Sequence, residues 1–264
     1  MLPDDLDPAQ FSARRVVQCF ADSATLTRAA AEEVVRRLEL AVHERGTAAM
    51  ALAGGSTPKS LYRLLAEEPA FRSRVPWAKV HFFFGDERHV SPDHSDSNFR
   101  MAHEAMFDRL APDLLPPGNV HRIRGELPAP DDAAIEYARE LERHFGPGHL
   151  PEFDVMLLGM GPDGHTASIF PGTSALRENA ITVCAVWVDK LSTYRITMTP
   201  PVLRHARAVI FLVAGPDKAR VLKSVLEGPP APDRYPAQGI VSPNGETLWL
   251  VDAAAAAAPR LPPN

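Results

Sequence analysis

The sequence predicts an α/β fold of three layers, α/β/α, with a mainly parallel sheet and helices on both of its faces. Short apolar runs alternate along the chain with longer segments whose apolar residues recur every third or fourth position. The runs are typical of strands buried on both faces and the longer segments of amphipathic helices, so their alternation indicates βαβ units. Several predicted strands end in polar turns that contain glycine. In such a sheet these turns meet at one edge, where ligands bind.

In the first half of the chain, each predicted helix has a recognisable pattern, start or end. Apolar residues recur every fourth position from Leu26 to Val42, and Gly46 ends that helix. Pro58 suits the first turn of the next helix. The predicted strands of this half are residues 15–20, 48–53, 80–84 and 120–123. Its predicted helices are residues 25–45, 98–110 and 131–145, with one more that starts at Pro58.

The second half continues the alternation, and we expect one domain over residues 13–253. A chain of 264 residues is long enough for a full core, and open α/β folds of this size often form a single domain. We expect flexible ends at residues 1–12 and 254–264, although the alanine run 253–258 also suits a helical turn. The predicted strands of this half are residues 155–158, 181–188, 195–199, 208–213 and 247–251, with a helix over 219–226.

Composition and charge exclude several classes of function. The formal net charge of -5 gives no broad attraction to nucleic acid or to an anionic membrane. The acidic start of the chain lacks the apolar core of a secretory signal, and no stretch is long and apolar enough for a transmembrane helix, so we expect a cytoplasmic protein. The two cysteines, Cys19 and Cys184, offer no disulfide framework or zinc ligand set. Both lie in apolar runs, which predicts buried free thiols.

The turn after the apolar run 155–158 carries the strongest chemical signal. Asp163 and His165 stand one glycine apart within a glycine-rich turn. Histidine titrates near neutral pH and a carboxylate can fix its tautomer, so this pair is a candidate for acid–base catalysis. The alternative is an ordinary Asp-Gly turn with a solvated histidine.

The turn after residues 48–53 predicts an anion site. Gly54, Gly55, Ser56 and Thr57 place free backbone N–H groups and two hydroxyls at the start of a helix, where the dipole favours negative charge. The turn lacks the lysine of a Walker A loop and the spacing of a dinucleotide fingerprint, which favours a small phosphate over ATP or NAD. The alternative is a plain N-cap.

Charged residues follow the predicted strand 80–84. Arg88 can clamp a phosphate or carboxylate, and Asp86 can hold a sugar hydroxyl or act on a proton. The alternative is a surface cluster of ion pairs, which contributes little. Asp86, Glu87, His89 and His94 fit no zinc pattern, so no metal is predicted here.

Two further basic residues stand at element boundaries. Arg195 opens a β-rich run, and Lys218 precedes a helix, where its charge opposes the dipole unless an anion binds. The alternative for Lys218 is a solvated side chain. Structural or solvent roles are predicted for the histidines outside any motif, which are His43, His81, His103, His121, His144, His149 and His205.

Together the turns resemble those of the 6-phosphogluconolactonase family. The matching segments come in the family's order, and they are residues 51–58 (ALAGGSTP), 84–90 (FGDERHV), 97–98 (SN), 158–168 (LGMGPDGHTAS), 195–199 (RITMT), 215–219 (GPDKA) and 235–237 (YPA). The resemblance implies an α/β/α fold related to glucosamine-6-phosphate deaminase. It also implies hydrolysis of 6-phosphoglucono-1,5-lactone in the pentose phosphate pathway, without metal or cofactor.

The resemblance also assigns roles to individual residues. It makes His165 the catalytic base, with Asp163 to orient it or stabilise its cation. It gives Arg88, Arg195 and Lys218, with the loop of Gly55, Ser56 and Thr57, to the substrate and its phosphate, without saying how the three basic residues divide that task. The remaining residues expected to contact substrate are Gly54, Asp86, Asn98 and Gly161.

Two rival functions share the predicted fold. The resemblance extends to glucosamine-6-phosphate deaminase, which carries an acidic residue shortly after the histidine; here Ile169 and Phe170 occupy that stretch and favour the lactonase. A sugar-phosphate sensor of a transcriptional regulator needs a DNA-binding module, and the roughly 15 residues before the first strand are too few for one. The expected partner is a small sugar-phosphate lactone, and the expected state is a monomer or weak homodimer.

Overall fold

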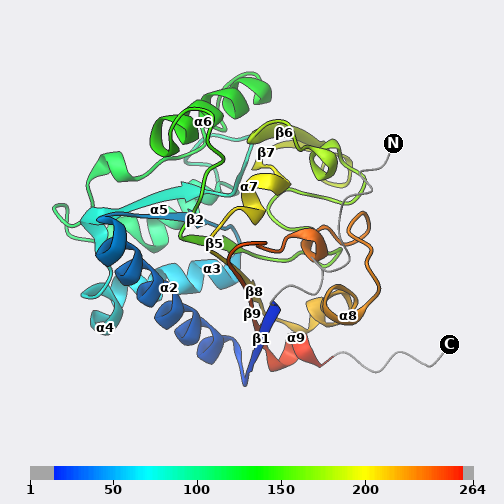
Figure 1. The fold of residues 1–264 in the computed structure, drawn as a ribbon, viewed down its shortest axis with the longest axis horizontal. Helices are drawn as coiled ribbons and strands as arrows, with labels where there is room; N and C mark the ends of the chain where they lie inside the picture. Colours follow the sequence, from blue (N-terminus) through cyan, green and yellow to red (C-terminus); the bar gives the residue numbers. More distant parts are fainter. Residues whose placement is uncertain (1–14, 258–264) are drawn as a thin grey trace.

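A computed structural model of the protein describes residues 15–257, and its centre is a six-stranded sheet (Figure 1). The strand order is β1-β9-β8-β5-β2-β3, and every neighbouring pair is parallel. The strands are β1 (Arg15–Phe20), β2 (Ala48–Leu52), β3 (Val80–Phe84), β5 (Val155–Leu158), β8 (Ala208–Val213) and β9 (Glu246–Asp252). The predicted parallel sheet is confirmed, with strand ends that differ by a residue or two.

Helices lie on both sides of this sheet. α2 and α3 pack against each other on one side, and α6, α7 and α8 lie on the other (Figure 1). Right-handed crossovers between parallel strands produce this distribution. The helices are α2 (Ser23–Arg45), α3 (Ser56–Glu67), α4 (Pro69–Arg72), α5 (Asn98–Ala105), α6 (Pro130–Phe145), α7 (Pro200–Arg204), α8 (Ala219–Glu227) and α9 (Ala253–Ala256).

A second sheet, of three antiparallel strands, was not anticipated from the sequence. Its order is β4-β7-β6, with β4 (Asp86–Arg88), β7 (Thr193–Met198) and β6 (Val183–Val188). Helix α6 packs against β6 and β7. The runs at 181–188 and 195–199 are strands as predicted, but β4 is too short to stand out from its polar turn. Because β4 follows β3 directly, this sheet lies beside the carboxyl edge of the large one.

Two predicted elements are wrong in type or length. Residues 120–123 do not form a strand: Val120 makes one isolated bridge to Phe82, and a 3-10 turn over Pro117–Asn119 precedes it. The expected helix over 98–110 ends at Ala105, and a separate 3-10 turn follows. In the first case the backbone makes one hydrogen bond to the neighbouring strand, from the His121 N–H to the Phe82 carbonyl at 2.8 Å, and then leaves the sheet.

The cysteine prediction is also wrong in part. Cys19 is exposed and Cys184 is half-buried. Cys19 lies on β1, an edge strand of the large sheet, where an apolar run is covered less completely than in the centre. Burial raises the pKa of the Cys184 thiol to about 12, so this cysteine is an unreactive thiol at neutral pH.

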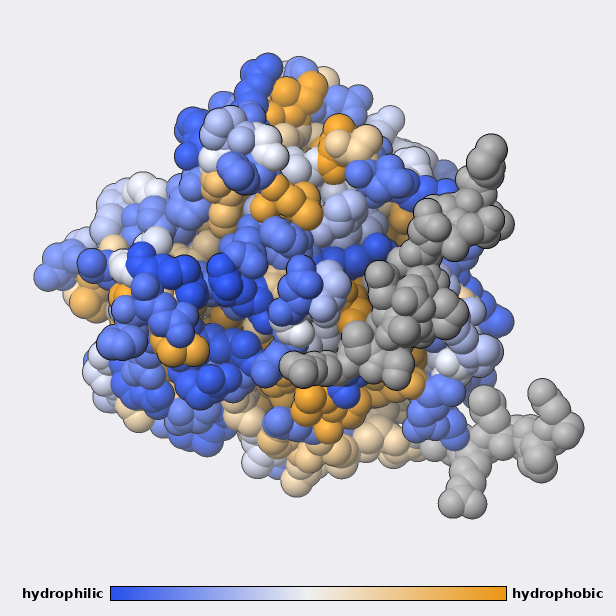
Figure 2. Space-filling model, in the orientation of Figure 1, coloured by the Kyte–Doolittle hydropathy of each residue, from blue (hydrophilic) through white to orange (hydrophobic). Residues whose placement is uncertain are grey.

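The core surrounds the central strands, and the outer helix surface is charged. Every residue of β2, β5 and β8 is buried. The face that carries α2 is strongly hydrophilic (Figure 2), and its ion pairs include those of Arg36 and Arg37 with Glu33. Within residues 15–257, helices fall short of the length and apolar character needed to cross a membrane.

The predicted chain ends fall mostly outside the described residues. Residues 1–14, which include the predicted flexible end at 1–12, and residues 258–264 are not described. At the described end, residues 253–256 of the alanine run form α9, and Asp252 caps this helix by accepting a hydrogen bond from the Ala255 N–H at 2.8 Å.

Candidate active site

The polar turns after β2, β3, β5 and β8 meet around one cavity of about 260 Å³. It lies at the carboxyl edge of the large sheet, which is the edge that the strand-end turns predict. All of the predicted site residues line it except Asp163 and Arg195. Those that do are Gly54, Gly55, Ser56, Thr57, Asp86, Arg88, Asn98, Gly161, His165 and Lys218.

His165 and Asp163 form the pair that their spacing suggests. The distance from His165 Nδ1 to Asp163 Oδ1 is 2.5 Å, and the backbone N–H of His165 donates to the same oxygen. Lys190, between β6 and β7, donates to the other oxygen of Asp163. Burial acts to raise the pKa of Asp163, but these hydrogen bonds outweigh it and hold that pKa well below its usual range. An ionised Asp163 accepts the Nδ1 proton, which leaves the lone pair on His165 Nε2.

The ring of His165 is also fixed in its plane. It stacks on Phe170 with ring centroids 4.0 Å apart, and the ammonium of Lys190 lies 4.5 Å from the centre of the Phe170 ring. On the turn itself, a Cβ built on Gly161 would lie 2.0 Å from His165 Cε1, so only glycine leaves room for the imidazole. Sequence reasoning missed Lys190, because nothing in its own segment marks it.

The rest of the turn is held by close backbone packing. Gly164 has φ +80°, and a Cβ there would lie 2.9 Å from the ring of Tyr235. Ala167 has φ +46°, a left-handed conformation that costs free energy in a residue with a side chain. Thr166 secures the turn by donating from Oγ1 to the Gly159 carbonyl at 2.8 Å. The position of the His165 backbone is therefore set by the whole turn.

Two arginines lie side by side next to this turn. Arg88 on β4 and Arg195 on β7 are direct cross-strand partners. Burial, followed by repulsion from Arg88, lowers the pKa of Arg195. Attraction to the carboxylates of Asp86, Glu87 and Asp96 opposes this lowering, and Arg88 donates from Nη1 to the Asp96 carbonyl oxygen. Like charges directly opposite on a sheet are destabilising, and a bound anion relieves that repulsion.

The start of α3 supplies further anion-binding groups. Gly55 is the N-cap residue with φ +105°, and no side chain caps this end of the helix. The plain N-cap alternative is therefore wrong, and the hydroxyls of Ser56 and Thr57 stay available at the cavity wall. Lys218 reaches the same cavity from the turn after β8, where its Nζ lies 2.6 Å from Asp217 Oδ2.

Asp86 and Asn98 form the third side of the cavity. Asp86 accepts hydrogen bonds from Ser168 Oγ at 2.6 Å and from Asn98 Nδ2 at 3.3 Å. Asn98 also touches the loop after β2, since a Cβ on Gly54 would lie 2.1 Å from its Oδ1. The sequence marked Asp86, Asn98 and Gly54 separately, and the fold joins them. Ser168 was overlooked as an Asp86 partner because the two are 82 residues apart.

Glu87 acts structurally. Its carboxylate is buried and accepts from the backbone N–H groups of Arg88, Asn98 and Phe99 and from Ser97 Oγ, at 2.7–3.0 Å. Burial raises the pKa of Glu87, and the three backbone donors act in the opposite direction. The carboxylate thereby anchors the start of α5, which carries Asn98.

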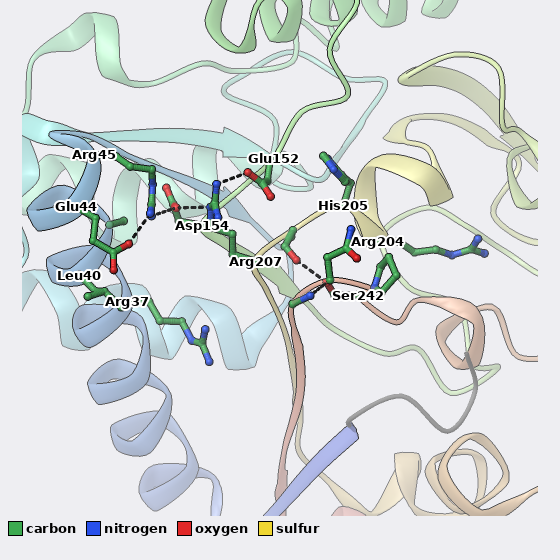
Figure 3. A pocket seen from close by; sticks show the side chains of 15 residues that line it. Arg37, Leu40, Glu44, Arg45, Glu152, Asp154, Arg204, His205, Arg207 and Ser242 are labelled. Carbon is green, nitrogen blue, oxygen red and sulfur yellow. Dashed lines mark hydrogen bonds and ion pairs between the residues drawn. The ribbon is translucent and has the colours of Figure 1, made fainter. Parts of the chain in front are cut away.

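A second cavity, of about 190 Å³, lies at the amino ends of β5 and β8 (Figure 3). Most of its charges are paired: Arg45 pairs with Asp154 at 2.6 Å, and Arg207 pairs with Asp154 at 3.5 Å and with Glu152, while Arg204 donates to the Gly239 carbonyl. The dashed lines in Figure 3 show this network. The cavity at the carboxyl edge is therefore the better anion site.

Comparisons with known proteins give consistent results. A family model described as "Glucosamine-6-phosphate isomerases/6-phosphogluconolactonase" matches residues 21–249. A 6-phosphogluconolactonase of Nostoc sp. is 41% identical over 249 residues, which are 92% of this chain and 98% of the relative. The crystal structure of 6-phosphogluconolactonase from Thermotoga maritima has a TM-score of 0.76 and 31% identity, and the match covers 90% of this chain and 100% of that one.

A glucosamine-6-phosphate deaminase, described as monomeric, is similar in fold alone. Its TM-score is 0.75 at 20% identity, over 91% of this chain and 98% of that chain. The fold class predicted from the sequence, including its relation to the deaminase, is confirmed by this similarity.

Proposed function

We propose a catalytic mechanism for this chain, which belongs to the glucosamine-6-phosphate isomerase/6-phosphogluconolactonase family. The chain hydrolyses 6-phospho-D-glucono-1,5-lactone to 6-phospho-D-gluconate, a step of the oxidative pentose phosphate pathway. His165 is the general base and Asp163 its positioning residue. The observation that carries the mechanism is the pair of His165 and Asp163 at a cavity that also holds Arg88, Lys218 and the start of α3.

The reaction begins with a water molecule at His165 Nε2. Since Nδ1–H donates to Asp163, Nε2 can take a proton from water as the oxygen attacks the lactone carbonyl. The tetrahedral intermediate collapses with cleavage of the bond between the carbonyl carbon and the ring oxygen. The imidazolium then returns its proton to that oxygen, so one water is consumed and no metal or cofactor takes part. Ionised Asp163 stabilises the imidazolium while it exists.

The oxyanion and the phosphate both need positive charge or N–H donors. Two N–H groups of the central turn are already used, because Gly161 donates to the His165 carbonyl and Gly164 to the Gly161 carbonyl. We therefore assign the negative charges to Arg88, Arg195, Lys218 and the N-terminus of α3. Asp86 and Asn98 are placed to hydrogen-bond sugar hydroxyls.

Phe170 supports hydrolysis over deamination. In this chain the segment after the central turn gives the histidine an apolar stacking partner, with Phe170 at 4.0 Å from the His165 ring. The family resemblance places an acidic residue of the deaminase in this stretch, where opening of an amino sugar needs an acid or base. We expect no ammonia release from glucosamine 6-phosphate under conditions that support lactone hydrolysis.

The test is lactone hydrolysis measured with the spontaneous rate subtracted. We expect His165→Ala to lower kcat by about 10²- to 10⁴-fold, the usual contribution of general acid–base catalysis. The matched control is His43→Ala, an exposed histidine of α2, which should keep the wild-type rate. Near wild-type turnover in His165→Ala would refute the assigned role.

Three further expectations stay predictions. They are one catalytic domain over residues 13–253, a monomer or weak homodimer in solution, and a cytoplasmic location. Light scattering of the purified chain checks the second.

A further inference from the structure

Three histidines without any sequence motif meet away from the active site. His81 lies on β3, His121 follows the 3-10 turn over Pro117–Asn119, and His144 lies in the last turn of α6. One ring nitrogen of each lies within 4.8 Å of the others. Each residue is half-buried, so the group has a wall of protein and a path to solvent.

We propose that His81, His121 and His144 bind one divalent transition-metal ion of the zinc type, with Glu140 as the hydrogen-bond partner that orients His121. Imidazole nitrogen is a preferred ligand of zinc, copper and nickel ions. Three histidines leave a fourth position for water in a tetrahedral site.

The hydrogen bond between His121 and Glu140 is the strongest evidence for a metal site. His121 Nδ1 lies 2.6 Å from Glu140 Oε1 on α6, so the carboxylate fixes the proton on Nδ1. The lone pair of His121 is therefore on Nε2, the nitrogen that faces His81 Nδ1 at 3.0 Å. Metal-bound histidines usually donate their other N–H to a carboxylate in this way.

The distances fit a common ion after a small adjustment. Two nitrogens bound to one tetrahedral zinc ion are about 3.3 Å apart, given Zn–N bonds of about 2.0–2.1 Å. The pair of His81 and His121 is already near that value at 3.0 Å. His144 must approach by a rotation of its side chain within the 4.8 Å that now separates the ring nitrogens.

The surroundings keep the rings aligned and neutral. Phe83 stacks on His121 with centroids 4.3 Å apart and an interplanar angle of 6°. Burial, followed by the neighbouring histidines, lowers the pKa of His144 to about 4, and burial also lowers the pKa of His81. At neutral pH these two rings therefore keep a lone pair for a metal ion.

The site is separate from the lactonase cavity. His81 is five residues before Asp86, about 16 Å along an extended chain, and the cluster does not line the catalytic cavity. A bound ion would tie edge strand β3 to α6, which makes the site structural. Lactone hydrolysis therefore should not depend on it.

The test is calorimetric titration of ZnCl₂ into the full chain without a histidine tag, after treatment with a chelator. The same titration of His165→Ala distinguishes zinc bound by the three histidines from zinc bound by His165 in the catalytic cavity. We expect one equivalent of zinc to bind, and a Co²⁺ titration to give the visible absorption of a tetrahedral site. No saturable binding, or no such absorption, overturns the proposal.

The alternative is that the three histidines and Glu140 only hydrogen-bond to one another and bind no metal. Variants distinguish the two cases. We expect His144→Gln to weaken zinc binding at least tenfold, and Glu140→Gln to weaken it by about 10- to 100-fold, as for other partners of metal-bound histidines. His43→Gln on α2 is the matched control and should bind as the wild type does. Retained lactonase activity shows that each variant is folded. Unchanged zinc affinity in folded His144→Gln and Glu140→Gln overturns the proposal.

Discussion

His165 depends on neighbours that fix both its tautomer and its ring plane. Asp163 sets the tautomer, Phe170 and Gly161 set the plane, and Lys190 holds Asp163. A general base needs its lone pair directed at the attacking water, so each of these contacts bears on the rate. Their loss should therefore change kcat more than the stability of the fold.

The substitution Asp163→Asn tests the tautomer. An asparagine can donate its amide N–H to Nδ1, which moves the imidazole proton to Nε2 and removes the lone pair from the water site. We expect kcat to fall on the order of 10²-fold or more, with KM changed little. Steady-state lactone hydrolysis measures both constants. If kcat/KM fell by the same factor because KM rose while kcat stayed unchanged, the assigned role would be contradicted.

Gly161→Ala tests the ring position. The new Cβ would lie 2.0 Å from His165 Cε1, so the imidazole must swing away from its present position. We expect at least a tenfold loss of kcat, with the thermal midpoint changed little because the ring can move. Gly118→Ala is the matched control, since Gly118 is exposed, does not line the cavity, and has no atom within 4 Å of a Cβ built there. Equal activities of the two variants would show that ring position does not matter.

At this scale the sequence predicted the residues of the strand-end turns but not their partners. Asp163, His165 and Gly161 share one turn, so their spacing alone suggests a common site. Lys190 and Ser168 reach Asp163 and Asp86 from distant segments. Such contacts depend on how segments far apart in the sequence pack together, and no local pattern encodes that packing. The three grouped histidines were missed for the same reason.

At the scale of the elements, an ion pair helps to hold the segment 120–127, for which the sequence predicted a strand at 120–123. Residues 120–127 have little regular structure, and Arg122 binds Glu126 through two hydrogen bonds of 2.9 and 2.8 Å. The apolar pattern suggested a strand, but the pairing with β3 is a single bridge between Val120 and Phe82. The ion pair holds the segment in its place.

Glu126→Gln tests this role as a function of pH. Hydrogen bonding to Arg122 is the main cause that lowers the pKa of Glu126 to about 2. A carboxyl whose pKa falls on folding stabilises the protein above its unfolded pKa, and this is lost as pH falls through the folded value. We expect the variant to be less stable by about 1 kcal/mol or less at pH 7. The difference in unfolding free energy between the variant and the wild type should shrink as the pH falls from about 4.5 to about 2. Urea unfolding at several pH values measures it. A difference that stays constant over this range would contradict the role of the ion pair.

For the whole molecule, the cationic cavity predicts stabilisation by its product. A ligand present at 100 times its Kd adds about 2.7 kcal/mol to the unfolding free energy. For a chain of this size we expect 6-phosphogluconate to raise the Tm by about 5–10 °C. Differential scanning fluorimetry measures the shift.

Variants of the basic residues show which of them bind the phosphate. Arg88→Met, Arg195→Met and Lys218→Met should reduce the Tm shift to the extent that each contacts the ligand. Arg36→Met on α2, where Glu33 engages the arginine, is the control and should keep the full shift. A full Tm shift in all three of these variants would contradict the proposed anion site.

The large sheet was the most predictable part of the molecule. β2, β5 and β8 are buried along their whole length, so their sequences are continuously apolar and easy to identify. The small sheet was harder, because β4 has three polar residues whose burial comes from contacts far along the chain. The local sequence pattern therefore predicted the layers of the fold. The arrangement of the active-site residues depends on strand pairing between segments that are distant in the sequence.

The pairing of β1 with β9 also has a consequence for how the chain folds during synthesis. Arg15 of β1 pairs with Thr247 of β9, so β1 has no neighbouring strand until β9 has been synthesised. Until the ribosome has released β9, β1 has no partner in the sheet, and β8 lacks one of its two neighbours. Contacts this distant in sequence form slowly, and unpaired edges invite aggregation. A truncation before β9 should therefore yield an insoluble product, although every lining residue of the catalytic cavity would still be present.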